Sequence, residues 1–150
     1  RTLLYINAGH NYPLCRRSSS LVERLKAGGI PLGVRTDSVY ETGTAALEPG
    51  DLLVIFTDGV VEAINERGEE YGDARLLSLV GQRPEESAHQ TVSRLMADLD
   101  AFVGSARQHD DLTVLIARVT ALGTKSQHNS TFPGIRDGNP GQDESTVLPP

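Results

Sequence analysis

The sequence lacks tryptophan, and aromatic residues make up only 5% of its 150 residues. A folded core must therefore rest on Leu, Val, Ile and Ala. The single cysteine, Cys15, excludes an internal disulfide and a cysteine-based metal site, and it fits the reducing cytoplasm, where we expect the protein. No signal peptide is visible, and the longest apolar run, Leu52–Phe56, is far too short to span a bilayer.

Positive charge is also scarce. The formal net charge is −6 at pH 7, and Arg16 and Arg17 form the only adjacent basic pair. We expect no nucleic-acid partner, because binding to a phosphate backbone needs several cationic contacts.

The first part of the sequence predicts short strands separated by glycine- and proline-rich turns. Residues 2–7 are apolar and β-prone, and we expect residues 12–17 to return beside them as a hairpin. Residues 21–25 are a further short strand, and 39–46 can be extended. Residues 28–33 contain three glycines and a proline, so they predict a loop.

The rest of the sequence predicts two strands, one before and one after a pair of helices. Leu52–Phe56 is typical of a strand buried on both faces, and residues 112–119 predict the last strand. Asp73 is a candidate cap for the first helix, and residues 84–86 mark the start of an amphipathic second helix that ends at Gly104. The polar composition of residues 121–150 predicts a disordered tail after a domain of residues 1–120.

Asp58 follows the buried strand directly and precedes Gly59. A carboxylate at a strand end can project into a cleft, and a neighbouring glycine lets the backbone approach a ligand closely. Asp-Gly is also a common turn dipeptide, so the pair taken alone is explained by a turn as well.

Asp110 and Asp111 stand before the last predicted strand, where adjacent side chains would point to opposite sides. An acidic loop end is the alternative explanation. If the two strands are neighbours, Asp58 and Asp110 converge, and close carboxylates repel unless a cation lies between them. Carboxylates without Cys or a histidine cluster favour Mg²⁺ or Mn²⁺, and two such ions roughly 3.5–4 Å apart are suited to hydrolysing phosphate esters.

His10 lies in a predicted turn between two candidate strands. A histidine there can act as an acid or a metal ligand. A turn also accepts a polar residue for structural reasons, so both interpretations stay open.

Six short motifs occur in order between residues 2 and 119. They read NAGHN at 7–11, GIPLG at 29–33, PGD at 49–51, FTDGVVEA at 56–63, GEEYG at 68–72 and QHDDLT at 108–113. Each motif is weak alone. Together they resemble the C-terminal part of the catalytic domain of the bacterial PPM-type (PP2C-like) serine/threonine phosphatases, in the SpoIIE/RsbU branch.

The resemblance implies an α+β fold, the αββα sandwich of PPM phosphatases, of which we expect only the C-terminal half. It implies hydrolysis of phosphoserine or phosphothreonine by a metal-activated water, without a phosphoenzyme intermediate. Asp58 and Asp110 match metal-binding positions for two Mg²⁺ or Mn²⁺ ions, with Gly59, Asp111 and His10 as supporting residues. The implied partner is a phosphorylated regulatory protein of the anti-sigma-antagonist type, and an upstream sensor domain is common.

One expected motif is absent from the sequence. The resemblance implies an upstream Asp-x-x-Gly-His-Gly motif whose Asp bridges the two metals, but Gly9-His10 is the only Gly-His pair and Ile6 stands three residues before Gly9. The chain also begins at Arg1 and enters an apolar strand at once. We therefore expect a fragment that binds metal weakly and is inactive alone.

Two other classes of function are possible on the sequence. A non-catalytic phosphoprotein-binding module, a degenerate phosphatase, is the main alternative, although both Asp58 and Asp110 are retained. A phosphoacceptor receiver domain fits poorly, because the acidic pair precedes the last strand and no lysine occurs between Lys26 and Lys125.

Overall fold

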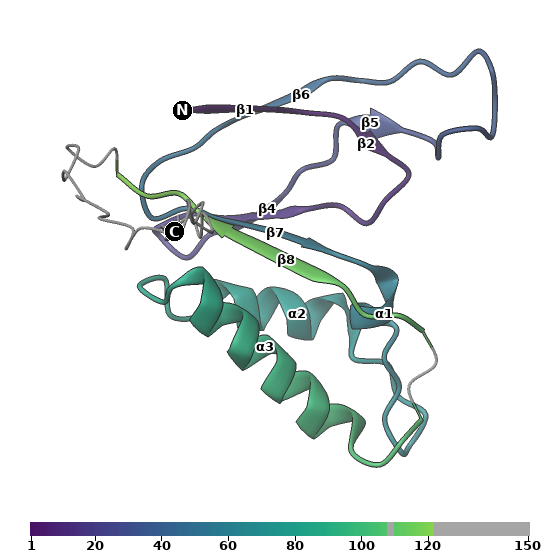
Figure 1. Ribbon diagram of the computed structural model, residues 1–150, viewed down its shortest axis with the longest axis vertical. Helices are drawn as coiled ribbons and strands as arrows, with labels where there is room; N and C mark the ends of the chain where they lie inside the picture. The colour runs from purple at the N-terminus through teal and green to yellow at the C-terminus, as the bar shows by residue number, and fades with distance from the viewer. Residues whose placement is uncertain (108–109, 122–150) are drawn as a thin grey trace, which may run out of the picture.

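The computed structural model describes residues 1–107 and 110–121, which form an α+β fold (Figure 1). Its largest sheet is antiparallel, with strands in the order β4-β3-β7-β8. Along the chain these strands are β3 (Leu14–Arg16), β4 (Val22–Arg24), β7 (Leu52–Phe56) and β8 (Val114–Arg118). The central strand β7 therefore has β3 on one side and β8 on the other.

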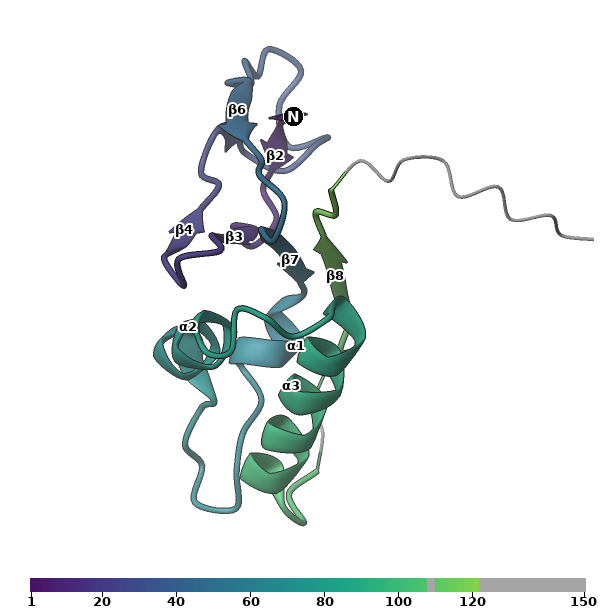
Figure 2. The same cartoon turned by 90° about the vertical axis from the view of Figure 1, so that its left-hand side faces the viewer.

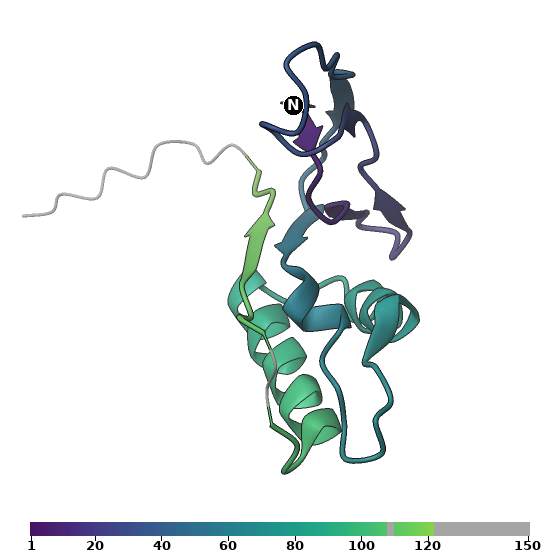
Figure 3. The ribbon, with the colours of Figure 1, turned by 90° about the vertical axis from the view of Figure 1, so that its right-hand side faces the viewer.

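A helical layer covers one face of this sheet, as Figures 2 and 3 show. It contains α2 (Gly72–Gly81) and α3 (Ala88–Val103), while the short α1 (Asp58–Val61) follows β7 directly. The main core lies between these helices and the sheet. Its buried residues are Leu14, Leu52, Val54, Phe56, Val60, Tyr71, Leu76, Leu79, Val80, Leu95 and Leu99.

Two pairs of short strands lie on the opposite side of the sheet (Figure 1). The strand β1 (Thr2–Tyr5) pairs antiparallel with β6 (Gly43–Ala46), and β2 (Asn7–Ala8) pairs parallel with β5 (Gly28–Gly29). A second, smaller core is centred on Cys15, Leu25 and Ala45, with Leu3, Tyr5, Leu47 and Leu53 packed around it. Successive β7 residues thus face different cores, which agrees with the predicted burial on both faces.

The expected hairpin of residues 2–7 and 12–17 is wrong. The first strand pairs with β6, and β3 pairs with β4 and β7. The connecting turn is held by the buried Asn7, whose Nδ2 donates to the His10 carbonyl oxygen at 2.8 Å and whose Oδ1 accepts from the His10 backbone N–H at 2.8 Å. The turn therefore carries the chain from one strand layer to the other.

The prediction of a loop across residues 28–33 is also wrong at its start. Gly28 and Gly29 form β5, and a Cβ atom on Gly28 would lie 1.8 Å from the Asn7 carbonyl oxygen. Glycine is required here because the two parallel backbones approach closely. Extension of residues 39–46 is confirmed as a strand only for Gly43–Ala46.

Both helices begin away from their predicted starts. Tyr71 occupies the N-cap position of α2, so Asp73 lies in the first turn instead of capping it. The second helix begins at Ala88, because Ser87 and Gln90 form a reciprocal capping box. Gly104 ends α3 as predicted. Gln108, His109 and all of the predicted tail after residue 121 lie outside the described residues.

Candidate functional site

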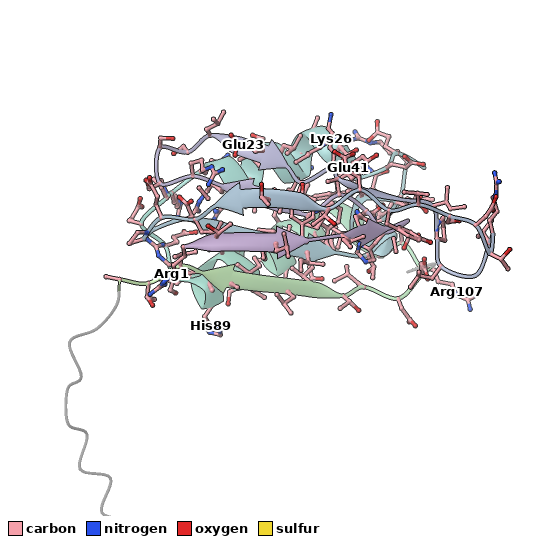
Figure 4. All side chains as sticks on the ribbon, turned by 90° about the horizontal axis from the view of Figure 1, so that it is seen from above. Arg1, Glu23, Lys26, Glu41, His89 and Arg107 are labelled. Carbon is pink, nitrogen blue, oxygen red and sulfur yellow. The ribbon has the colours of Figure 1, made fainter. Side chains whose placement is uncertain are left out.

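The ends of β7 and β8 meet at one edge of the four-stranded sheet, next to α1 (Figure 1). Phe56 and Val114 form the last register pair, and the Thr57 backbone N–H continues the pairing by donating to the Thr113 carbonyl oxygen at 3.1 Å. The condition that the two strands are neighbours is therefore confirmed. Figure 4 shows Arg107, on the chain leading into residues 110–111, at the opposite end of the sheet from Arg1.

The side chain of Thr57 fixes the loop before β8. Its hydroxyl donates to the Asp111 carbonyl oxygen at 3.1 Å and accepts from the Thr113 backbone N–H at 3.0 Å. Sequence reasoning missed this role, because a Thr in front of Asp-Gly gives no sign of a partner more than 50 residues away.

Gly59 follows Asp58 in α1 and is buried. A Cβ atom added there would lie 2.5 Å from the Asp111 carbonyl oxygen and 3.6 Å from that of Asp110. Gly59 is thus required by a close approach to the protein backbone of the 110–111 loop, and its predicted approach to a ligand stays a prediction.

Asp58 and Asp110 both expose their side chains at this edge. The Oδ1 atom of Asp58 accepts from the Gly59 backbone N–H at 3.1 Å, and that of Asp110 accepts from the Asp111 backbone N–H at 2.7 Å. Each carboxylate is thus oriented by the next peptide group. Asp110 and Asp111 lie in the loop before β8, which begins at Val114, so the predicted alternation of their side chains along a strand is wrong.

His10 is exposed in the turn after β2, with its ring Nδ1 3.1 Å from the Asn11 carbonyl oxygen. It lines a cavity of about 250 Å³ together with Tyr12, Phe56 and Val61. Phe56 and Val61 lie on either side of Asp58 in the chain, so His10 belongs to the same edge of the sheet. Among the described residues, no hydrogen bond or ion pair joins it to Asp58 or Asp110.

A larger cavity of about 450 Å³ opens on the helical side of this edge. Its lining includes Gly59 and Asp110, together with residues of α3 and of the segment that follows α1. Sequence reasoning did not predict this cavity, because its walls come from three separate parts of the chain.

Other motif residues serve the scaffold. Asp51 is buried and accepts hydrogen bonds from Arg17 at 2.9 Å and from the backbone N–H groups of Ser18 and Glu48 at 3.1 Å. Burial alone raises the pKa of Asp51, but these hydrogen bonds outweigh it and hold the pKa below its ordinary value. The hydroxyl of Tyr71 likewise donates to Asp98 at 2.7 Å across α2 and α3.

The donor set fits part of a site for hard divalent cations. Asp58 and Asp110 offer carboxylate oxygens, which are the ligands that Mg²⁺ and Mn²⁺ prefer. Within residues 1–107 and 110–121, however, no group of three His, Cys, Asp or Glu side chains is placed to hold a metal ion. The described residues therefore offer carboxylates suited to such a site but not a complete set of ligands.

Comparison with solved structures defines the class of fold. The chain superposes on the SiaA-PP2C domain of Pseudomonas aeruginosa with a TM-score of 0.68 and 23% sequence identity, covering 79% of this chain and 46% of that domain's chain. The α+β architecture is thus that of the PP2C-type domains, and the chain spans less than half of that structure.

Sequence comparison then gives the family. Residues 1–120 match the family model described as Stage II sporulation protein E (SpoIIE), so the chain belongs to that family. It is 31% identical over 117 residues to the phosphoserine phosphatase RsbU of Bacillus subtilis, covering 76% of this chain and 34% of that protein. Protein IcfG of a Synechocystis species is 27% identical over 113 residues, with 75% and 18% covered. Both relatives are therefore much longer than the matched region.

No helix in the described part of the chain combines the length and the apolar content needed to cross a membrane.

Proposed function

We propose that this chain is part of a metal-dependent protein serine/threonine phosphatase. The observation that carries the proposal is the pairing of β7 with β8, which brings the segments of Asp58 and Asp110 together at one sheet edge. Membership of the SpoIIE family and the likeness to RsbU, which is named a phosphoserine phosphatase, support the same activity.

In this proposal Asp58 and Asp110 bind Mg²⁺ or Mn²⁺ through their carboxylates. When bound, a pair of such ions supplies an activated water and neutralises charge on a phosphate ester. Thr57 and Gly59 position the two ligands, because one ties the 111–113 backbone to β7 and the other lets α1 pack directly on it. Asp111 and His10 are supporting residues of the same edge, and Asp111 acts mainly through its backbone.

The substrate in this proposal is a phosphoserine or phosphothreonine of a regulatory partner protein. The cavities beside His10 and Asp110 open to the solvent, and the side chains of the candidate ligands are exposed. A phosphorylated residue on the surface of another protein can therefore reach them. The much greater length of RsbU and IcfG is compatible with a further sensor region in the parent protein.

A second candidate is a phosphoprotein-binding module without catalysis. It is favoured by the incomplete metal-ligand set of the described residues. The sequence also has no Asp three residues before Gly9, so the chain alone lacks the metal-bridging ligand that the family resemblance implies. We therefore expect the chain by itself to be inactive, whichever candidate holds for the full-length protein.

The test uses the full-length protein that contains this chain, with a phosphoserine peptide as substrate. Asp58→Asn and Asp110→Asn should each abolish Mn²⁺-dependent hydrolysis, while circular dichroism shows an unchanged fold. Asp111→Asn should cost less. The exposed Asp37, in the loop before β6, lines neither cavity and provides a matched control, so Asp37→Asn should retain activity. Near-normal turnover by either of the first two variants would rule out the metal assignment. Metal-independent binding without turnover in the wild type would favour the second candidate.

A further inference from the structure

The cavity beside Asp110 has an apolar floor and an acidic rim. Its apolar lining comes from Ala63, Ile64, Met96, Leu99, Val103 and Leu112. Leu99 is buried and the others are partly buried, so the floor continues the main core to the surface. A volume of about 450 Å³ lies within the range of ligand pockets, roughly 300–1,000 Å³.

The rim carries four exposed carboxylates, those of Glu62, Glu70, Asp100 and Asp110. No Lys or Arg is among the described residues that line the cavity. Like charges gathered at the mouth of a low-dielectric pocket raise the local concentration of cations and favour a basic ligand. The net charge of −6 acts in the same direction.

Three of these carboxylates differ from two acidic side chains on the same segments. Glu66 accepts from the Ser105 hydroxyl at 2.5 Å, and Asp98 binds Arg75 at 2.9 Å. By contrast, no other described residue forms a side-chain hydrogen bond or an ion pair with Glu62, Glu70 or Asp100. Their charges are therefore available to a molecule that enters the cavity.

We propose that this cavity binds a basic and apolar segment of the phosphorylated partner protein. An apolar side chain of that segment fills the floor, and an adjacent Lys or Arg pairs with the carboxylates of Glu70 and Asp100. Because Asp110 belongs both to the rim and to the candidate metal ligands, the segment lies next to the residue that is dephosphorylated. The proposal rests on the proposed function, and it adds which sequences around the phosphoserine are selected.

The hairpin that follows α1 gives this cavity a fixed wall. Ile64 and Glu70 form an isolated antiparallel bridge, and the Glu66 carboxylate ties the hairpin to the end of α3 through the backbone and hydroxyl of Ser105. The hairpin that carries Glu70 and the helix α3 that carries Asp100 are thus held together by hydrogen bonds. Such a site is preorganised, which lowers the entropy cost of binding.

Met96 offers a direct probe, because it is the only methionine of the chain and it lines the cavity. The chain is released from a cleavable tag that leaves no methionine, and the Met96 methyl group is labelled with ¹³C. Its single NMR signal is followed during titration with short phosphoserine peptides. One peptide carries Lys-Leu on each side of the phosphoserine, and its controls carry Glu-Leu or Lys-Ser.

The Lys-Leu peptide should shift the Met96 signal in a saturable way, and both control peptides should bind more weakly. Combining Glu70→Gln with Asp100→Asn should weaken Lys-Leu binding about tenfold, since each exposed charge pair contributes a few-fold. Higher salt should weaken the same binding. The control combines Glu41→Gln with Glu48→Gln, which removes the same charge from exposed sites outside the cavity and should leave the affinity unchanged.

Equal binding of the three peptides, an unshifted Met96 signal, or equal affinities of the two double variants would overturn the proposal. The titration does not depend on turnover, so its failure is distinct from failure of the proposed function. If the full-length protein hydrolyses phosphoserine without any preference for Lys-Leu, the proposed phosphatase activity stands and the proposed binding cavity is ruled out. Selective binding of the Lys-Leu peptide without hydrolysis would support the cavity and rule out the phosphatase activity.

Discussion

The backbone of Gly59 lies so close to that of Asp111 that a Cβ atom on Gly59 would be 2.5 Å from the Asp111 carbonyl oxygen. This distance is shorter than any contact that a methyl group tolerates, and the obstructing atom belongs to a main chain that cannot move aside alone. The segment of one candidate metal ligand is therefore in direct contact with the segment of the other.

Gly59→Ala should lower the free energy of unfolding by about 1–3 kcal/mol, because the added methyl group forces α1 and the 110–111 loop apart. Chemical denaturation of the chain measures this change. Gly81→Ala is the control, since a Cβ atom there meets its nearest neighbours at 3.5 Å, which is ordinary contact. A loss of stability equal to that of the control would contradict the close packing of Gly59 on Asp111.

The carboxyl group of Asp51 should make the free energy of unfolding depend on pH in the acid range. Its pKa is held below the ordinary value by hydrogen bonds from Glu48, Arg17 and Ser18, which outweigh the effect of burial. A depressed carboxyl pKa contributes stability above the unfolded value of about 3.9, and this stability is lost as the pH falls through the folded pKa. Unfolding measured between about pH 7 and pH 2 should therefore show a decline below about pH 4.

Asp51→Asn should cost about 1–3 kcal/mol at neutral pH and should flatten that decline, because a buried charge-assisted acceptor is lost. Glu85→Gln, at an exposed position, should change the stability by less than about 0.5 kcal/mol. Some acid dependence should persist in Asp51→Asn, since hydrogen bonds from Arg75 also lower the pKa of Asp98. An unaltered pH profile in Asp51→Asn would exclude this role.

Tyr71→Phe should destabilise the packing of α2 against α3 by about 0.5–1.5 kcal/mol. The substitution removes the hydroxyl that donates to Asp98 at 2.7 Å but keeps the edge-to-face contact of the ring with Phe102, whose centroid is 5.4 Å away. Asp98 keeps its ion pair with Arg75, so the loss stays modest. Thermal unfolding compares Tyr71→Phe with Tyr71→Ala, which also removes the buried ring and should cost more than twice as much.

Mn²⁺ should bind the isolated chain only weakly, because no group of three His, Cys, Asp or Glu side chains among the described residues is placed to hold a metal ion. Isothermal titration calorimetry should find a dissociation constant well above the micromolar range. The weak heat of Mn²⁺ binding should disappear in Asp58→Asn. A micromolar site in the wild-type chain would show that the ligand set is more complete than proposed here.

Local patterns predicted the elements of this fold better than their pairing. The apolar run of β7 and the three-and-four spacing of α3 are visible in the sequence, since each depends on nearby residues. The pairing of β1 with β6 joins segments about 40 residues apart through only four residues a strand, so neither strand carries a signal of its partner. The two-residue strands β2 and β5 depend on Gly28 and were beyond prediction for the same reason.

The candidate site was predicted to a similar extent. The sequence alone indicated Asp58 and Asp110 and the condition that their strands be neighbours, which β7 and β8 fulfil. It gave no indication of the Thr57 hydroxyl, whose partners are on the other strand. Nor did it indicate the cavity, because Glu70 and Asp100 are brought to one rim only by the packing of a hairpin on α3.

Asp58 lies just after β7 and Asp110 stands before β8, and α2 and α3 lie between them in the chain. The distance between the two residues depends on how the adjacent strands β7 and β8 pair and not on the length of the chain segment between them. Altered surface residues in α2, α3 and their connection can therefore leave the two carboxylates in place. In the proposed function, the carboxylates of Glu70 and Asp100 that select the partner lie in this intervening stretch, whereas Asp58 and Asp110 flank it, and Asp110 belongs to both sites.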